Sequence, residues 1–205
     1  MAIASELVQV APSLFIWQAY DPAVKADLFS SAIVTVDGAF LVDPIPLRSE
    51  AIDELLGLAR VVGIIVTSGN HLRAANQFAK QFSVSVFTRR EAFPDKMRAQ
   101  YRELGDGEHI CDELRVTGIE GAGPGEIALY YAAGKGTLIV GDALINFEPY
   151  GFTFLPAKYC SNEKEMRRSL RELLSYKADR MLFAHGLPIL SGASDRLQTL
   201  LDSDV

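Results

Sequence analysis

Three histidines are the side chains of this sequence best suited to metal or proton chemistry: His71, His109 and His185. Neutral imidazole is a common zinc ligand, and histidine changes its charge near neutral pH. Histidines this far apart in the sequence do not define a metal site by spacing. The residues around each histidine therefore decide whether it is a candidate ligand. His109 stands between acidic residues in a loop that enters a predicted strand, which favours an ordinary surface or core residue over a metal ligand.

The other two histidines lie where a predicted strand gives way to a turn or a helix. The segment 66–78, VTSGNHLRAANQF, follows a buried strand and opens a helix, and the segment 183–188, FAHGLP, follows a short strand. A third segment, 121–142, runs from a glycine-rich loop through a hairpin and ends at Asp142. Open α/β sheets bind ligands at such strand ends and helix N-termini, so polar groups in all three segments are candidate site residues.

The elements that must position these segments mix hairpins with alternating strands and helices. Asp37-Gly38 separates two apolar runs, at 32–36 and 39–42, and a two-residue turn of this type is typical of a β-hairpin. A second hairpin is predicted at 127–140. The predicted helices lie at about 49–59, 72–82, 91–104, 162–174 and 192–201. The other predicted strands lie at about 7–10, 14–17, 61–66, 84–87, 114–119 and 181–183. Hairpins at similar places in the two halves predict one α+β domain, 1–205, built as a four-layer αββα sandwich.

Composition excludes several classes of protein. The chain has 26 acidic and 20 basic residues and a net charge of −6, which argues against nucleic-acid or anionic-membrane partners. We find no apolar stretch long enough for a membrane span and no basic region of a secretory signal in the first twenty residues, so we expect a cytoplasmic location. Cys111 and Cys160 form no metal-binding pair and are expected to be free, buried thiols.

Five segments, in order, resemble motifs of the metallo-beta-lactamase superfamily, a large set of hydrolases and their relatives. The segments are AFLVDPI at 39–45, VTSGNHLRAA at 66–75, GAGPGEIALYY at 121–131, LIVGDAL at 138–144 and FAHGLPIL at 183–190. The fold of that family is the αββα sandwich that the order of elements predicts. The resemblance therefore implies a hydrolase-like protein whose old active-site cleft lies among these segments.

The resemblance also implies that most of the family's metal ligands are replaced. Asp142 and His185 match ligand positions. The other five ligand positions hold Ser68, Asn70, Leu72, Arg73 and Ala122. One carboxylate and one imidazole are too few for zinc, and the permanent charge of Arg73 would repel a dication. This interpretation predicts a degenerate site, a non-metal pseudoenzyme with no metal and no cofactor, and a small-molecule ligand in the old cleft.

His71 opens an alternative, because it lies one residue beyond the position that Asn70 takes. A shifted register would make His71, Asp142 and His185 a three-ligand metal site of an active hydrolase. A further variant uses Asp142 and His185 as acid–base partners around Ser68, although Ser68 lacks the strained turn of serine hydrolases. An interaction protein without a small-molecule site is the third class.

The cleft candidates are therefore Ser68, Asn70, His71, Arg73, Asp142 and His185. In the metal-free case, a buried carboxylate without a partner would be costly, so it needs a cation. We expect Arg73 to contact Asp142 directly or through one water, with Asn70 and His185 lining the same pocket.

Overall fold

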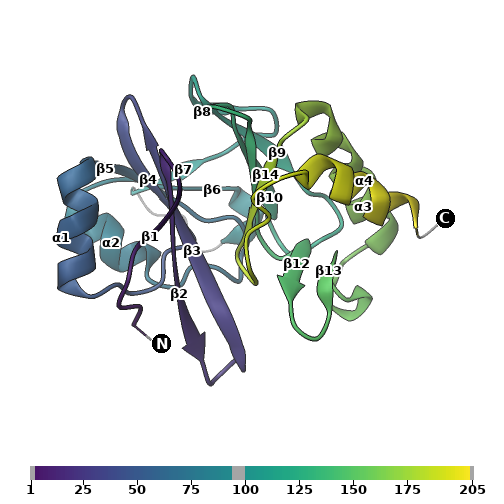
Figure 1. The fold of residues 1–205 in the computed structure, drawn as a ribbon, viewed down its shortest axis with the longest axis horizontal. Coiled ribbons are helices and arrows are strands. Elements are labelled where there is room, and N and C mark those ends of the chain that lie inside the picture. The colour runs from purple at the N-terminus through teal and green to yellow at the C-terminus, as the bar shows by residue number, and fades with distance from the viewer. Residues whose placement is uncertain (1–2, 94–99, 204–205) are drawn as a thin grey trace. The chain divides into compact units, whose positions relative to one another are not determined.

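The computed structural model describes residues 3–93 and 100–203 of the chain. The chain divides into two compact units, Met1–Glu103 and Leu104–Val205, called here the first and the second unit. Figure 1 shows the first unit in purple to teal and the second in teal through green to yellow. Each unit has its own sheet and its own hydrophobic core.

The sheet of the first unit has seven strands in the order β1-β2-β3-β4-β5-β6-β7. Neighbours are antiparallel from β1 to β4 and parallel from β4 to β7. The strands are β1 Val8–Ala11, β2 Leu14–Asp21, β3 Ala26–Thr35, β4 Gly38–Val42, β5 Val61–Ile65, β6 Val86–Thr88 and β7 Tyr101–Glu103. The helices are α1 Ser49–Leu58 and α2 Ala75–Phe82, with a 3-10 turn η1 at Arg90–Ala92. Helix α1 joins β4 to β5 and α2 joins β5 to β6, because parallel neighbours need a crossover connection.

The β3–β4 hairpin confirms the turn predicted at Asp37 and Gly38. Thr35 pairs with Gly38 at the end of the ladder, and Gly38 has a φ of +136°. A Cβ atom at Gly38 would lie 2.6 Å from the carbonyl oxygen of Arg60, so glycine is required there. The hairpin sets the register of β4, and Asp43 follows directly at the carboxyl end of that strand.

The second unit has a five-stranded sheet in the order β14-β11-β10-β9-β8 and a separate two-stranded sheet of β12 and β13. Strands β11 and β14 are parallel, and the other pairs are antiparallel. The strands are β8 His109–Cys111, β9 Leu114–Gly118, β10 Ile127–Tyr131, β11 Thr137–Val140, β12 Leu144–Phe147, β13 Gly151–Phe154 and β14 Arg180–Phe183. The helices are α3 Glu163–Glu172 and α4 Ala193–Asp202, with 3-10 turns η2 Ala157–Tyr159 and η3 Leu173–Tyr176.

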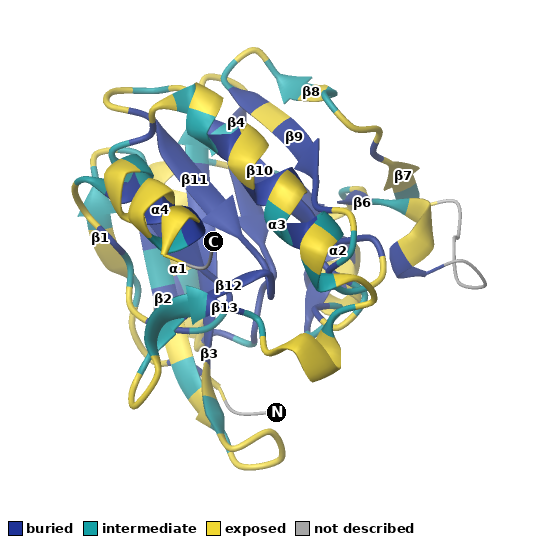
Figure 2. Cartoon of the chain, turned by 90° about the vertical axis from the view of Figure 1, so that its right-hand side faces the viewer, coloured by how far each residue is buried: buried dark blue, intermediate teal, exposed yellow. Residues whose placement is uncertain are grey.

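Helices α3 and α4 cover one face of this five-stranded sheet, with their exposed sides turned outward (Figure 2). Met166 and Leu170 of α3 and Leu197 and Leu201 of α4 are buried in the core of the second unit. Their spacing of four residues places each pair on one helix face. The side chain of Asn162 accepts a hydrogen bond from the backbone N–H of Glu165 and so caps α3, a role that asparagine often takes at helix N-termini.

Three local predictions were wrong. The helix predicted at 91–104 is a 3-10 turn at Arg90–Ala92 and a strand at Tyr101–Glu103, and 94–99 lie outside the described residues. Helix α2 begins at Ala75 rather than at 72, because Arg73 has a left-handed φ of +36° that a helix cannot include. The residue types also predict Ser49 as the N-cap of the first helix, but Ser49 is the first residue of α1 and Arg48 is its N-cap. Strands β8, β12 and β13 were not predicted. None of the described helices is long and apolar enough to cross a membrane.

Candidate functional site

Polar residues of the first unit gather where two neighbouring parallel strands end. Val42 of β4 pairs with Ile65 of β5, so the residues that follow the two strands lie beside each other. Asp43 follows β4, and Thr67 is the second residue after β5. The loop after Thr67 then carries His71 before α2 begins. This is the edge of a sheet at which α/β proteins place functional groups.

Asp43 and His71 form a buried hydrogen-bonded pair. The Nδ1 atom of His71 lies 3.0 Å from Oδ2 of Asp43, and both side chains are at most 3% exposed. Asp43 also accepts hydrogen bonds from the backbone N–H of Thr67 at 2.8 Å and from the Thr67 hydroxyl at 2.5 Å. Burial by itself raises the pKa of Asp43, but the interactions with His71, Arg73 and Thr67 together hold that pKa below its ordinary value. An ionised Asp43 accepts the Nδ1 proton of His71, so the lone pair of the neutral ring lies on Nε2.

The backbone around Asp43 is itself held by side chains. Asp43 has a left-handed φ of +47°, and its carbonyl oxygen accepts a 2.7 Å hydrogen bond from the Ser30 hydroxyl. Arg73 donates from Nη1 to the same carbonyl at 3.0 Å and to the carbonyl of Phe29 at 2.6 Å. The Ser30 hydroxyl in turn accepts the backbone N–H of Ile45 at 2.9 Å. This network fixes a backbone conformation that aspartate rarely adopts and aims its carboxylate at His71.

The second unit repeats the same arrangement of strand ends. Val140 of β11 pairs with Phe183 of the parallel strand β14. Asp142 and His185 each lie two residues beyond that pair, and Nε2 of His185 is 3.3 Å from Oδ1 of Asp142. Oε1 of buried Glu126 accepts a 3.0 Å hydrogen bond from the backbone N–H of Ala143. This bond anchors the turn that carries Asp142.

The spacing of the Asp142 and His185 atoms suits two ligands of one metal ion. Zinc–nitrogen and zinc–oxygen bonds of about 2.0–2.2 Å at a tetrahedral angle place neighbouring ligand atoms about 3.4 Å apart. The observed 3.3 Å is close to that value. It is longer than a charge-assisted hydrogen bond, which is usually about 2.7–2.9 Å. The donor atoms of this pair therefore fit a divalent ion.

The remaining predicted residues divide between the loop and the core. In the loop after β5, Ser68 is fully buried and accepts a weak 3.5 Å hydrogen bond from the backbone N–H of Asn70, which is itself exposed. Leu72 packs against the core of the first unit, and Ala122 lies in the core of the second. His109 is exposed on β8. The structure thus brings Ser68, Asn70, His71 and Arg73 together on one loop and pairs Asp142 with His185.

Sequence reasoning missed the residues that support these side chains. Asp43 was noted only as part of a motif, and neither Thr67 nor Glu126 was a candidate. A polar residue within three positions of a buried parallel strand's end was the available signal for Asp43 and Thr67. Glu126 had no such signal, because a glutamate after a glycine-rich loop is ordinarily a surface residue.

The fold is shared with solved metallo-beta-lactamases. The structure of DIM-1 metallo-beta-lactamase matches with a TM-score of 0.75 and 16% sequence identity, over 98% of both chains. A metallo-beta-lactamase from Erythrobacter litoralis gives 0.74 at 14% identity over 96% of both chains. A metallo-beta-lactamase family protein from Thermus thermophilus gives 0.68 at 20% identity, over 96% of this chain and 80% of that one. These likenesses confirm the predicted α+β fold class.

The sequence comparison agrees with the structural one. No curated protein matches the chain. A family profile described as "Metallo-beta-lactamase superfamily" matches residues 8–204, which is nearly the whole sequence. This match confirms the resemblance that the five ordered motifs indicate. The chain belongs to the metallo-beta-lactamase superfamily.

Proposed function

We propose that the protein is a hydrolase that uses one divalent metal ion, held by Nε2 of His71, a carboxylate oxygen of Asp142 and Nε2 of His185. Two imidazoles and a carboxylate are a ligand set found in catalytic zinc sites, which keep a further position open. The observation that carries the proposal is the hydrogen bond from Nδ1 of His71 to Asp43. Metal-binding histidines almost always donate their other ring N–H to a carboxylate or carbonyl group.

The residues of the chain would divide the work between holding the ion and placing the substrate. Bound zinc supplies Lewis acidity, which polarises carbonyl and phosphoryl oxygens. Asp43 and Thr67 hold the His71 ring in the tautomer that a metal ligand needs, and Glu126 holds the turn of Asp142. Arg73 is a fixed cation, and guanidinium groups bind carboxylate and phosphate well.

The charge of Arg73 does not by itself exclude a metal. Its guanidinium donates to two backbone carbonyls, including that of Asp43, and its charge lowers the pKa of the buried Asp43 carboxyl. The positive charge of Arg73 and the negative charge of ionised Asp43 therefore cancel each other. The residual repulsion on a nearby dication is much smaller than for a lone guanidinium.

The test is zinc-dependent hydrolysis by the full chain. Protein stripped of metal by a chelator is assayed on nitrophenyl esters, nitrophenyl phosphodiesters and a chromogenic lactam, before and after addition of zinc. We expect hydrolysis of at least one substrate class to require zinc and to fall at least tenfold in Asp142→Asn, with the exposed Asp112→Asn variant as the matched control. Equal rates with and without zinc, or an unchanged rate in Asp142→Asn, would contradict the proposal.

A second candidate is a metal-free relative that binds a small molecule in the old cleft. The observation in its favour is the replacement of five ligand positions by Ser68, Asn70, Leu72, Arg73 and Ala122. In that case Arg73 neutralises Asp142, and the pair takes the place of the ion. Removal of Arg73 would then leave the aspartate without its cation, and Arg73→Ala would destabilise the protein by roughly 3–5 kcal/mol. Arg73 supports the Asp43 network in either case, so the double variant separates the two candidates: Asp142→Asn should recover part of the loss in Arg73→Ala only where Arg73 neutralises Asp142.

A further inference from the structure

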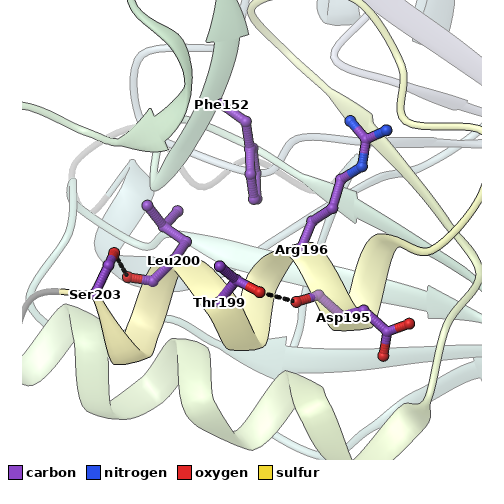
Figure 3. A pocket seen from close by; sticks show the side chains of 6 residues that line it. All are labelled: Phe152, Asp195, Arg196, Thr199, Leu200 and Ser203. Atoms are coloured by element: carbon purple, nitrogen blue, oxygen red, sulfur yellow. Dashed lines mark hydrogen bonds between the residues drawn. The ribbon is translucent and has the colours of Figure 1, made fainter.

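An open groove on the second unit lies between the β12–β13 ribbon and helix α4. It has a volume of about 400 Å³ and is lined by Phe152, Asp195, Arg196, Thr199, Leu200 and Ser203. Figure 3 shows the Phe152 ring standing over α4, with Leu200 on one side of it and the long Arg196 side chain on the other. Phe152 and Leu200 both pack against the core of this unit, so the floor of the groove is apolar and fixed.

Strand β13 has an open backbone edge beside this groove. Residues that face each other across an antiparallel pair alternate between bonding each other and pointing their N–H and C=O groups outward. The backbone groups of Asn146 in β12 point outward from the ribbon. Its N–H donates to the carbonyl oxygen of His185, and its C=O accepts from the N–H of Leu187. Phe152 is opposite Asn146 and so points its own N–H and C=O outward, on the other edge of the ribbon. In the described part of the chain, no strand pairs with that edge.

Arg196 adds a positive charge to the same groove. Its guanidinium has no hydrogen bond or ion pair among residues 3–93 and 100–203. The Asp195 carboxylate, which also lines the groove, points the opposite way from the guanidinium in Figure 3. The hydroxyls of Thr199 and Ser203 donate hydrogen bonds to carbonyl oxygens of their own helix, so Arg196 is the cationic group of the groove that is available to a ligand.

We propose that this groove binds an extended acidic peptide segment of another protein, which adds to β13 as a third strand. Main-chain hydrogen bonds to Phe152 would supply affinity, as in other cases of strand addition, and side-chain pockets would supply specificity. One apolar side chain of the peptide would pack on Phe152 and Leu200. A glutamate or aspartate two positions away, on the same face of the added strand, would pair with Arg196.

The first test is a nuclear magnetic resonance titration of the full chain with a synthetic peptide. The probe is acetyl-Thr-Val-Thr-Val-Thr-Glu-amide, whose valines and glutamate occupy alternate positions. We expect saturable shifts of the backbone amides of Phe152, Arg196 and Thr199. We expect no saturation with the same peptide carrying N-methyl groups on alternate amides. The proposal would be overturned by shifts centred elsewhere or by equal binding of the N-methylated peptide. It would also be overturned if no saturable shift occurred with a dissociation constant of about 1 mM or below, which corresponds to about −4 kcal/mol.

Variants separate the charge from the backbone edge. Arg196→Glu should weaken the peptide at least tenfold, whereas Arg168→Glu, an equal change of charge at an exposed site on α3, should leave the affinity within twofold. Phe152→Ala keeps the outward N–H and Phe152→Pro removes it without breaking a bond to β12, so the proline variant should bind several-fold more weakly than the alanine variant. Equal affinities in either comparison would overturn the proposal. Amide shifts of Phe152 that depend on protein concentration without peptide would assign the edge to a second copy and would also overturn it.

Discussion

Asp43 and His71, 28 positions apart in the sequence, form a hydrogen bond of 3.0 Å inside the first unit. The contact exists because β4 and β5 are parallel neighbours in register, so the residues after their carboxyl ends meet. Asp142 and His185 meet by the same rule after β11 and β14. Each unit thus presents a carboxylate and an imidazole at the end of a parallel strand pair.

The Asp43 carboxylate should contribute to stability as well as to the orientation of His71. Asp43→Asn removes the charge that three buried hydrogen bonds share, so we expect the free energy of unfolding to fall by at least roughly 2 kcal/mol in urea titrations. Asp53→Asn, on the exposed face of α1, is the control and should change it by less than about 0.5 kcal/mol. Equal effects of the two changes would mean that the Asp43 network is not a stabilising feature.

Gly121 should be sensitive to the smallest substitution. It has a φ of +84°, and an added Cβ would lie 2.2 Å from the Asn162 carbonyl oxygen at the start of α3. Backbone atoms cannot yield as a flexible side chain does, so Gly121→Ala should destabilise the protein by roughly 2–3 kcal/mol in urea unfolding.

A matched substitution gives the opposite sign. Gly57 lies within α1, and nothing lies within 4 Å of its added Cβ. Gly57→Ala should therefore stabilise the protein by up to about 1 kcal/mol, because alanine favours helix more than glycine does. A loss of stability in Gly57→Ala as large as that in Gly121→Ala would show that the clash is not the cause.

The fold could be predicted further than the site. The Asp37-Gly38 turn and the strands at 127–131 and 137–140 follow from local turn chemistry and β-rich runs, and the structure confirms them. The helix predicted at 91–104 was wrong at both described ends, since local residue types do not reveal that Tyr101 pairs with Val86 in the sheet. Strands β12 and β13 were missed because each has only four residues, too few for an alternating pattern to identify a strand.

For the site, sequence reasoning identified the side chains that could act but not their supports. Asp142 and His185 were candidates because they match ligand positions of the family that the sequence resembles, and His71 because it lies one residue beyond such a position. The bond between His71 and Asp43 depends on the register of two strands, and the anchoring of Ala143 by Glu126 depends on a contact 17 positions apart. Such contacts are set by packing and leave no mark on local patterns.

The Asp179 carboxylate should make the stability of the protein depend on pH. The pKa of Asp179 is held below its ordinary value, chiefly by the 2.9 Å hydrogen bond from the backbone N–H of Gly192 at the start of α4. A lowered folded-state pKa stabilises the protein above the unfolded pKa, near 3.9, and that stabilisation is lost as the pH falls through the folded pKa. The stability difference between wild type and Asp179→Asn should therefore be largest near neutral pH and shrink below about pH 3.9. A difference that grows on acidification would contradict this.

The thiol of Cys160 should react slowly with alkylating reagents. Burial raises its pKa, and the nearby carboxylates of Glu163 and Glu126 raise it further. Because the thiolate is the reactive form, alkylation of Cys160 in a Cys111→Ser background should be slower at neutral pH than that of a free cysteine. The rate should rise with pH to a midpoint above the ordinary thiol value. A midpoint at or below the free-cysteine value, measured by mass spectrometry of iodoacetamide labelling, would count against this environment.

Zinc binding measured by calorimetry on metal-free protein tests the proposed site most directly. We predict about one zinc ion per chain for the wild type, with the three ligands His71, Asp142 and His185. His109→Gln, at an exposed histidine on β8, should bind zinc like the wild type, whereas His71→Gln should bind at least about tenfold more weakly. No zinc binding by the wild type, or equal binding by His71→Gln and His109→Gln, would contradict the single-metal site.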